Sequence, residues 1–199
     1  MNESTTDKFT KIYFVRHAQP DFSVRDDSVR PLTSEGLNDT RVVLETLKDK
    51  KIDVFLCSPL PRSIETIKST AEFYGKEIII DERFMERKSG PKGNSKDLIF
   101  ERWKDRNWHE DGGESLNSTQ VRNVEALTEV LDKYAGKNIV IGTHGTALSL
   151  ILNHYYPERG FDDFMRIIDW MPYVIEAVFD GQKLLSTIEL AFVYKEFKK

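Results

Sequence analysis

Four side chains that could bind or transfer a phosphoryl group stand where the sequence predicts the ends of buried strands. Short apolar runs bounded by strand-breaking residues are typical of such strands. Ligand sites of open α/β sheets lie at the carboxyl ends of the strands, so we expect the four side chains to share one crevice. Fixed guanidinium charges beside imidazoles suit a phosphoryl group, because both can donate hydrogen bonds to its oxygens. The four residues are Arg16, His17, Arg62 and His144.

The segments that would position these residues alternate between strand and helix patterns. We expect strands at 12–15, 54–57, 78–80 and 138–143, a helix that starts within 32–36 and runs to about 47, and helices at 61–74 and 117–135, with another helix starting near 145. This alternation predicts a mostly parallel sheet with helices on both faces, a three-layer α/β/α fold. The stretch Asp180-Gly181-Gln182-Lys183 separates two further apolar runs, 173–179 and 184–190, and predicts a hairpin that forms an antiparallel C-terminal edge.

The helical periodicity also predicts which side of each helix is buried. In the helix 34–47, which Thr33 or Ser34 would cap, the apolar face includes Leu37. In the helix 117–135 the apolar face includes Val121. We therefore expect both apolar side chains to pack against the sheet.

The stretch 82–113 breaks the alternation and is predicted to form a helical lid within a single domain of residues 1–199, with a charged helical piece at 95–106. Its basic side chains could hold a second acidic group of a substrate, although charges on such a segment more often form a solvated face. Trp103 and Trp108 could stack on a substrate ring or anchor the lid to the body. The basic residues are Lys88, Lys92, Lys96, Arg102 and Arg106.

The amino-acid composition limits the classes of protein to which the chain can belong. The chain has 199 residues, of which 39% are hydrophobic and 31% charged, and this balance is typical of a globular domain. No apolar stretch approaches the roughly 20 residues that cross a bilayer, so we expect no membrane partner. The net charge of -4 argues against a nucleic-acid partner. The N-terminal MNESTTDKFT has no apolar signal region, which makes the cytoplasm the expected location.

Two further expectations concern the single cysteine and the sheet edge. Cys57 stands among apolar residues at a predicted strand end, and we interpret it as a buried structural thiol rather than a nucleophile. The C-terminal hairpin could pair with a second copy and form a homodimer, although sheet edges are commonly protected instead.

Several short motifs stand in a fixed order along the chain. They are Arg16-His17-Ala18, then Ser58-Pro59-Leu60-Pro61-Arg62 followed by Thr66, then Glu86-Arg87 ahead of Gly90, then Gly113-Glu114-Ser115, and finally Thr143-His144-Gly145. On these motifs the chain resembles, nearly from end to end, the histidine phosphatase superfamily, which includes the cofactor-dependent phosphoglycerate mutases.

The resemblance implies a role for each matching residue. His17 would be the nucleophile and would carry the phosphoryl group as a phosphohistidine. Glu86 would protonate the leaving group and later deprotonate water, with Glu82, one helical turn away, or Glu114 as the alternative acid. Ser23 and Arg87 are candidate substrate contacts, and we expect the Arg87 side chain to turn outward from the catalytic crevice. The residues implied to bind the phosphate are Arg16, Arg62, His144 and Gly145.

The chain also departs from the family pattern. Ala18 replaces the usual glycine, Pro20 has no side-chain donor, and Ser23 is shorter than the asparagine found in many relatives. These departures favour hydrolysis of a small phosphomonoester over mutase chemistry. A phosphoglycerate mutase stays open as an alternative, and so does a module that binds phosphate without turnover. The resemblance implies no metal or other cofactor, and the four histidines lack the spacing of zinc ligands.

Overall fold

The apolar runs of the sequence form the central strands, because β-branched and aromatic side chains pack well on the two covered faces of such a sheet. The strands are β1 (Thr10–Arg16), β2 (Val54–Cys57), β3 (Ile78–Ile80), β4 (Asn138–Thr143), β5 (Trp170–Asp180) and β6 (Lys183–Tyr194). The computed structural model describes residues 9–91 and 93–196. Lys92 and residues 1–8 of the N-terminal segment, both named in the sequence analysis, lie outside the described residues.

The six strands form one sheet in the order β3-β2-β4-β1-β5-β6. Strands β3, β2, β4 and β1 are parallel, β5 is antiparallel to β1, and β6 is antiparallel to β5. The prediction of a mostly parallel sheet with an antiparallel C-terminal edge is therefore confirmed. The hairpin strands are longer than the apolar runs that indicated them, because the pairing continues to Trp170 and Tyr194 at one end and to Asp180 and Lys183 at the turn.

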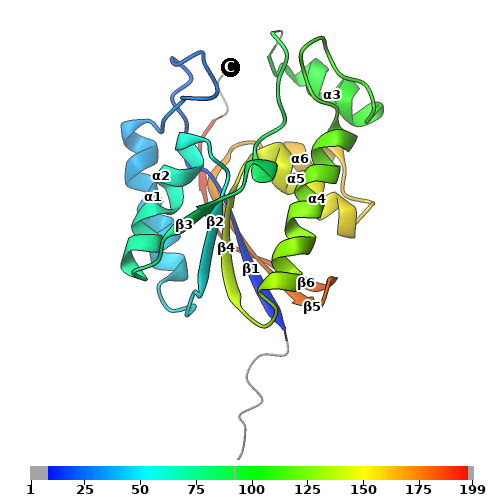
Figure 1. The fold of residues 1–199 in the computed structure, drawn as a ribbon. Helices are drawn as coiled ribbons and strands as arrows, with labels where there is room; N and C mark the ends of the chain where they lie inside the picture. The colour runs from blue at the N-terminus through cyan, green and yellow to red at the C-terminus, as the bar shows by residue number, and fades with distance from the viewer. Residues whose placement is uncertain (1–8, 92, 197–199) are drawn as a thin grey trace, which may run out of the picture.

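Helices cover both faces of the sheet, as predicted (Figure 1). The helices α1 (Ser34–Leu47) and α2 (Pro61–Phe73) lie on one face, and α4 (Leu116–Lys133), α5 (Gly145–Tyr155) and α6 (Phe161–Ile167) lie on the other. Each face has its own buried apolar cluster, and the side chains of β1 and β4 contribute to both. No helix in the described part of the chain is long and apolar enough to cross a membrane.

In two helices, one side chain that was predicted to be buried is exposed. Leu37 is 50% exposed and Val121 is 56% exposed. A helix buries positions three or four apart, and some of these positions here carry small or polar residues. Gly36 is one of them, because a Cβ at this position would lie 2.4 Å from the Gln19 carbonyl oxygen. The positions buried in α1 are Gly36, Thr40, Val43 and Leu47, and those in α4 include Thr119, Asn123, Leu127 and Val130.

The lid segment, residues 82–113, lies beyond the carboxyl ends of the parallel strands, on the side of α5 and α6 (Figure 1). It contains the short 3-10 helix η1 (Glu82–Phe84) and the helix α3 (Lys96–Lys104), which corresponds to the predicted helical piece at 95–106. Ile99 of α3 packs against Phe164 and Ile168 at α6, and Trp103 covers this cluster. Trp103 therefore anchors the lid segment to the body of the protein.

Two arginines of the lid segment are buried, which corrects two expectations. Arg102 is 2% exposed and does not belong to a solvated face, and Arg87 is 4% exposed and does not turn outward. Their Nη2 atoms lie 2.7 Å and 2.9 Å from the carboxylate of Glu110, which is also buried. Burial opposes ionisation of Glu110, but hydrogen bonds from the Gly90 N–H and the two guanidinium groups lower its pKa to about 2. The pairing explains the burial, because a buried charge needs a partner.

Candidate active site

The carboxyl ends of β1, β2 and β4 meet at one edge of the sheet. The His17 N–H donates to the Thr143 carbonyl and the Ser58 N–H donates to the Gly142 carbonyl, each over 3.1 Å, so the parallel pairing continues one residue past each strand. The ring centroids of His17 and His144 are 5.2 Å apart. The two histidines, more than 100 positions apart in the sequence, therefore lie side by side.

His17 is held in one tautomer by its own backbone. Its Nδ1 lies 2.7 Å from the Ala18 carbonyl oxygen, and because a carbonyl only accepts, Nδ1 must carry the proton. Burial lowers the pKa of His17 well below its ordinary value, and the charges of Arg62 and Arg16 lower it further. The imidazole is therefore neutral, and the lone pair is on Nε2. The backbone N–H of Ala18 donates to Thr66 Oγ1 over 2.9 Å and fixes this turn against α2.

His144 also has one engaged and one open ring nitrogen. Its Nε2 lies 2.7 Å from Ser58 Oγ, and that oxygen accepts a hydrogen bond from the Leu60 N–H. Within the described residues its Nδ1 is buried without a partner. Burial, with the nearby positive charge of Arg62, lowers the pKa of His144 well below its ordinary value. If the Ser58 hydroxyl donates to Nε2, the open Nδ1 carries a proton that a bound anion could accept.

Arg62 presents a buried positive charge in the first turn of α2 and is 3% exposed. Its Nη1 donates to the Asp27 carbonyl over 2.9 Å, and its Nη2 donates to the Asp27 carboxylate over 3.0 Å. Arg30 donates to the other oxygen of the same carboxylate. The sequence did not single out Asp27, yet this residue engages donors that a bound anion could use.

Arg16 is a second buried cation and lies at the end of β1. Its Nη1 and Nη2 donate to the carbonyls of Ile167 and Ile168 over 2.5 Å and 2.9 Å, at the C-terminal end of α6, where the helix dipole favours a cation. Its Nε has no partner among the described residues. Burial lowers the pKa of Arg16 to about 10, so the side chain stays charged at neutral pH. Gly145 leaves room for it, since a Cβ there would lie 3.1 Å from Arg16 Cζ.

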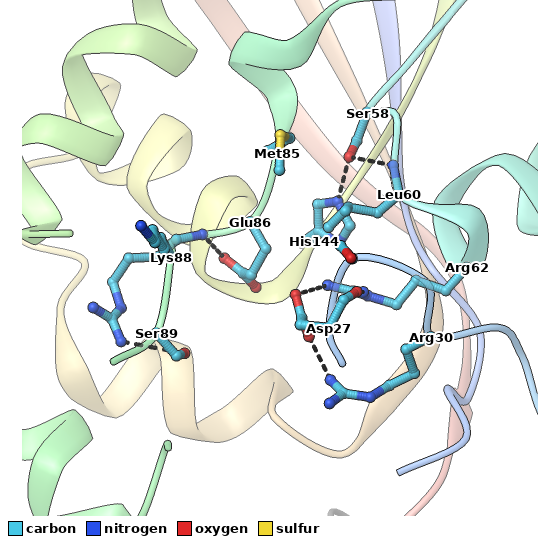
Figure 2. A network of polar contacts seen from close by, with 12 residues as sticks. Asp27, Arg30, Ser58, Leu60, Arg62, Met85, Glu86, Lys88, Ser89 and His144 are labelled. Carbon is cyan, nitrogen blue, oxygen red and sulfur yellow. Dashed lines mark hydrogen bonds and ion pairs between the residues drawn. The ribbon is translucent and has the colours of Figure 1, made fainter. Parts of the chain in front are cut away.

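Glu86 follows η1 and reaches the N-terminus of α5. Its Oε2 accepts from the Thr146 N–H over 3.0 Å, and its Oε1 accepts from the Ala147 N–H over 3.1 Å. The first N–H groups of a helix have no partner within the helix, so they hold the carboxylate in place. Figure 2 shows this carboxylate facing the pair formed by Arg62 and Asp27.

These groups line a solvent-open pocket of about 700 Å³ between the sheet edge, the lid segment and α6. The candidate site residues that line it are Arg16, His17, Arg62, Glu86, Arg87 and Gly145. His144 is fully buried, in contact with the ring of His17. Ser23 is exposed and donates to the Asp21 carboxylate rather than lining the pocket, and the alternative acid Glu82 is exposed outside it.

Cys57 has the structural character that the sequence indicated. Its thiol is buried and donates to Ser63 Oγ over 3.3 Å, and burial raises its pKa to about 12, so no thiolate forms near neutral pH. Within residues 9–91 and 93–196, no group of three or more His, Cys, Asp or Glu side chains is arranged to hold a metal ion.

A comparison with protein families identifies the chain at this point. The family model described as histidine phosphatase superfamily (branch 1) matches residues 12–169, which include every candidate site residue named above. The chain belongs to this superfamily. The resemblance that the short motifs indicated is therefore confirmed over most of the chain.

Relatives of this chain include proteins named as probable mutases. The protein is 29% identical over 157 residues to the probable phosphoglycerate mutase GpmB of an Enterobacter species, with 72% of this chain and 73% of the relative covered. The corresponding protein of Photorhabdus laumondii is 28% identical over 156 residues, with 71% and 73% covered.

Solved structures with the same fold include phosphatases. A mycobacterial glucosyl-3-phosphoglycerate phosphatase superposes with a TM-score of 0.72 at 16% identity, over 91% of this chain and 97% of that protein. A mutant of the phosphoserine phosphatase of Entamoeba histolytica, in complex with phosphoserine, gives a TM-score of 0.72 at 17% identity, over 92% of this chain and 96% of that protein. At such low identity these likenesses establish that the histidine phosphatase fold is shared.

The buried histidines predict that this protein loses stability in mild acid. The pKa values of His17 and His144 lie below 6.5 in the folded protein, so below about pH 6.5 the unfolded chain binds more protons. The free energy of unfolding should therefore fall by about 1.4 kcal/mol in total for each histidine as the pH is lowered from about 7.5 to about 5.5. Urea titrations in phosphate-free buffer between about pH 7.5 and about pH 5.5 measure this slope. The double variant H17Q/H144Q should have a shallower slope, and an unchanged slope would contradict the account.

Proposed function

We propose that the protein is a phosphomonoesterase that transfers the phosphoryl group of a small phosphorylated molecule first to His17 and then to water. The observation that carries the proposal is the state of His17: a neutral imidazole with Nδ1 fixed by a carbonyl and Nε2 free, in a pocket that also holds the guanidinium groups of Arg16 and Arg62. A nucleophilic histidine needs this combination.

In the first step the Nε2 lone pair attacks phosphorus and the ester P–O bond breaks. The leaving oxygen takes a proton from Glu86, which would enter the step as the carboxylic acid and leave it as the carboxylate. Arg16, Arg62 and the open Nδ1 of His144 would donate to the phosphoryl oxygens as negative charge develops on them. The Gly145 backbone at the start of α5 belongs to the same phosphate site, because helix N-termini favour anions.

In the second step water attacks the phosphohistidine and the P–N bond breaks. Glu86 accepts the proton of the water, so that inorganic phosphate leaves, His17 is again neutral, and Glu86 is again protonated. The hydrogen bonds from Thr146 and Ala147 support this role, because they hold the carboxylate at the pocket without occupying His17. Glu82 has no such support, since its side chain is exposed away from the pocket.

Phosphoglycerate mutase activity is the second candidate, and the names of the relatives favour it. The contacts of the lid segment support hydrolysis instead, because Arg87 and Arg102 already donate to Glu110 and would have to turn from it to hold a substrate carboxylate. Incubation with either phosphoglycerate isomer distinguishes the two activities. A hydrolase forms inorganic phosphate without the other isomer, whereas a mutase interconverts the isomers.

Replacement of the nucleophile gives the most direct test. H17A should abolish phosphate release from a panel of phosphomonoesters and should abolish the phosphoenzyme, because His17 is the one histidine among the described residues that lines the pocket. Rapid acid-free quenching with radiolabelled substrate should trap an acid-labile, alkali-stable label in the unchanged protein. The control is H154A, at an exposed histidine of α5, which should keep both phosphate release and phosphoenzyme formation. Normal turnover by H17A would refute the covalent mechanism.

Replacement of the acid tests the assignment of Glu86. E86Q should slow hydrolysis of alkyl phosphates by about 10²-fold or more, since their poor leaving groups need a proton in the transition state. For aryl phosphates, which have good leaving groups, the rate of the first step should fall much less. The matched control is E82Q, which should behave as the unchanged protein. An equal loss for alkyl and aryl substrates in phosphoenzyme formation would assign the proton transfer to another group.

A further inference from the structure

The pocket has an apolar wall above its charged floor. The floor is built from Arg16, His17, Arg62 and Glu86, whereas the side toward the lid segment and α6 is lined by hydrocarbon and aromatic groups. A leaving group attached to phosphorus at His17 would extend toward this wall. The wall residues are Phe22, Ile99, Trp103, Leu116, Phe164 and Ile168.

Packing of the lid segment alone does not account for this wall. Ile99, Phe164 and Ile168 contact one another and hold α3 on α6. Leu116, at the start of α4, lies outside that cluster and still faces the pocket. Phe22 comes from the loop after β1 and is only partly buried. Apolar side chains from four separate segments therefore line the pocket, and only some of them also pack against one another.

The charged groups beside the wall are engaged with the protein. Arg102 uses all three of its nitrogens, on Glu110, on Asn94 and on the Gly93 carbonyl. Arg87 donates to Glu110 and to the Glu114 carbonyl. A carboxylate or second phosphate on the substrate would have to break these buried pairs, and leaving a buried charge without its partner is costly.

Arg30 is engaged in the same way on the other side of the floor. Its Nε and Nη2 donate to the carbonyls of Val24 and Arg25, and its Nη1 donates to Asp27. The third cation near the phosphate site is therefore also held by protein acceptors, two of which are backbone carbonyls.

We infer that the group esterified to phosphate is apolar, an alkyl or aryl group without a second anionic charge. This inference rests on the proposed phosphatase function, because it assigns the leaving group of that same reaction. When the ester binds, its hydrocarbon part leaves water and contacts the apolar wall. The ion pairs of Arg87 and Arg102 with Glu110 disfavour acidic leaving groups. The preference therefore lies in the pocket walls and is separate from the phosphate site.

Binding of phosphonates tests the inference without turnover. Titration calorimetry compares ethylphosphonate, n-hexylphosphonate and the hexyl compound with a terminal carboxylate. A buried methylene contributes about fourfold in affinity, so the hexyl compound should bind at least about tenfold more tightly than the ethyl compound. The carboxylate should cancel that gain. Equal affinity of the ethyl and hexyl compounds, or tighter binding of the carboxylate, would overturn the inference.

A variant of the wall locates the preference. W103A should reduce the hexyl-to-ethyl affinity ratio by at least about threefold, since the indole supplies part of the wall. The matched control is F100A on the neighbouring turn of α3, whose ring is exposed and packs on Phe161 outside this pocket, and the ratio should stay unchanged. A drop of the ratio in F100A but not in W103A would contradict the location.

Hydrolysis of ethyl and n-hexyl phosphate by the unchanged protein separates the two proposals. If neither ester releases phosphate but the hexyl phosphonate binds more tightly, the phosphatase proposal fails and the apolar pocket stands. If both esters are hydrolysed with the same kcat/KM, the phosphatase proposal stands and the apolar leaving group is overturned.

Discussion

The hydrogen bond from His17 Nδ1 to the Ala18 carbonyl is the interaction on which the account of the site depends. It places the proton on Nδ1 and leaves the lone pair on Nε2, and without it the imidazole could adopt the tautomer that cannot attack phosphorus. The bond is possible because β1 ends at this point and the next residue turns toward α2, where Thr66 accepts from the Ala18 N–H. Burial beside two guanidinium groups then keeps the ring neutral.

The second constraint is the cost of burying positive charge. Arg16, Arg62 and Arg102 are each less than 5% exposed, and all three donate to backbone carbonyls or carboxylates. A bound anion could replace some of these hydrogen-bond partners more easily than others. The carbonyls at the end of α6 are fixed by a helix, whereas Asp27 is on an exposed loop and its side chain is 55% exposed. Exchange of Asp27 for a phosphoryl group at Arg62 would therefore require the least rearrangement.

The strands and the pocket floor could be predicted because they depend on local patterns. Short apolar runs bounded by breakers gave β1, β2 and β4 within a few residues, and the residues at their ends follow from the geometry of parallel sheets. The partners of the buried arginines depend on contacts between distant segments. Nothing in the local sequence links Glu110 to Arg87, so the expectation that Arg87 turns outward was wrong. Leu37 and Val121 were assigned to the core for a related reason: hydrophobicity does not reveal that glycine, threonine and asparagine occupy the buried positions.

The state of the His17 ring is the property that most directly decides the account. Nitrogen NMR of histidine-labelled protein, with the H17Q variant to assign the signals, reports both the charge and the tautomer of the ring. We expect a neutral ring with the proton on Nδ1 throughout the range from about pH 7.5 to about pH 5.5 in phosphate-free buffer. A ring that becomes cationic near pH 6.5, or a neutral ring with the proton on Nε2, would contradict the proposed nucleophile.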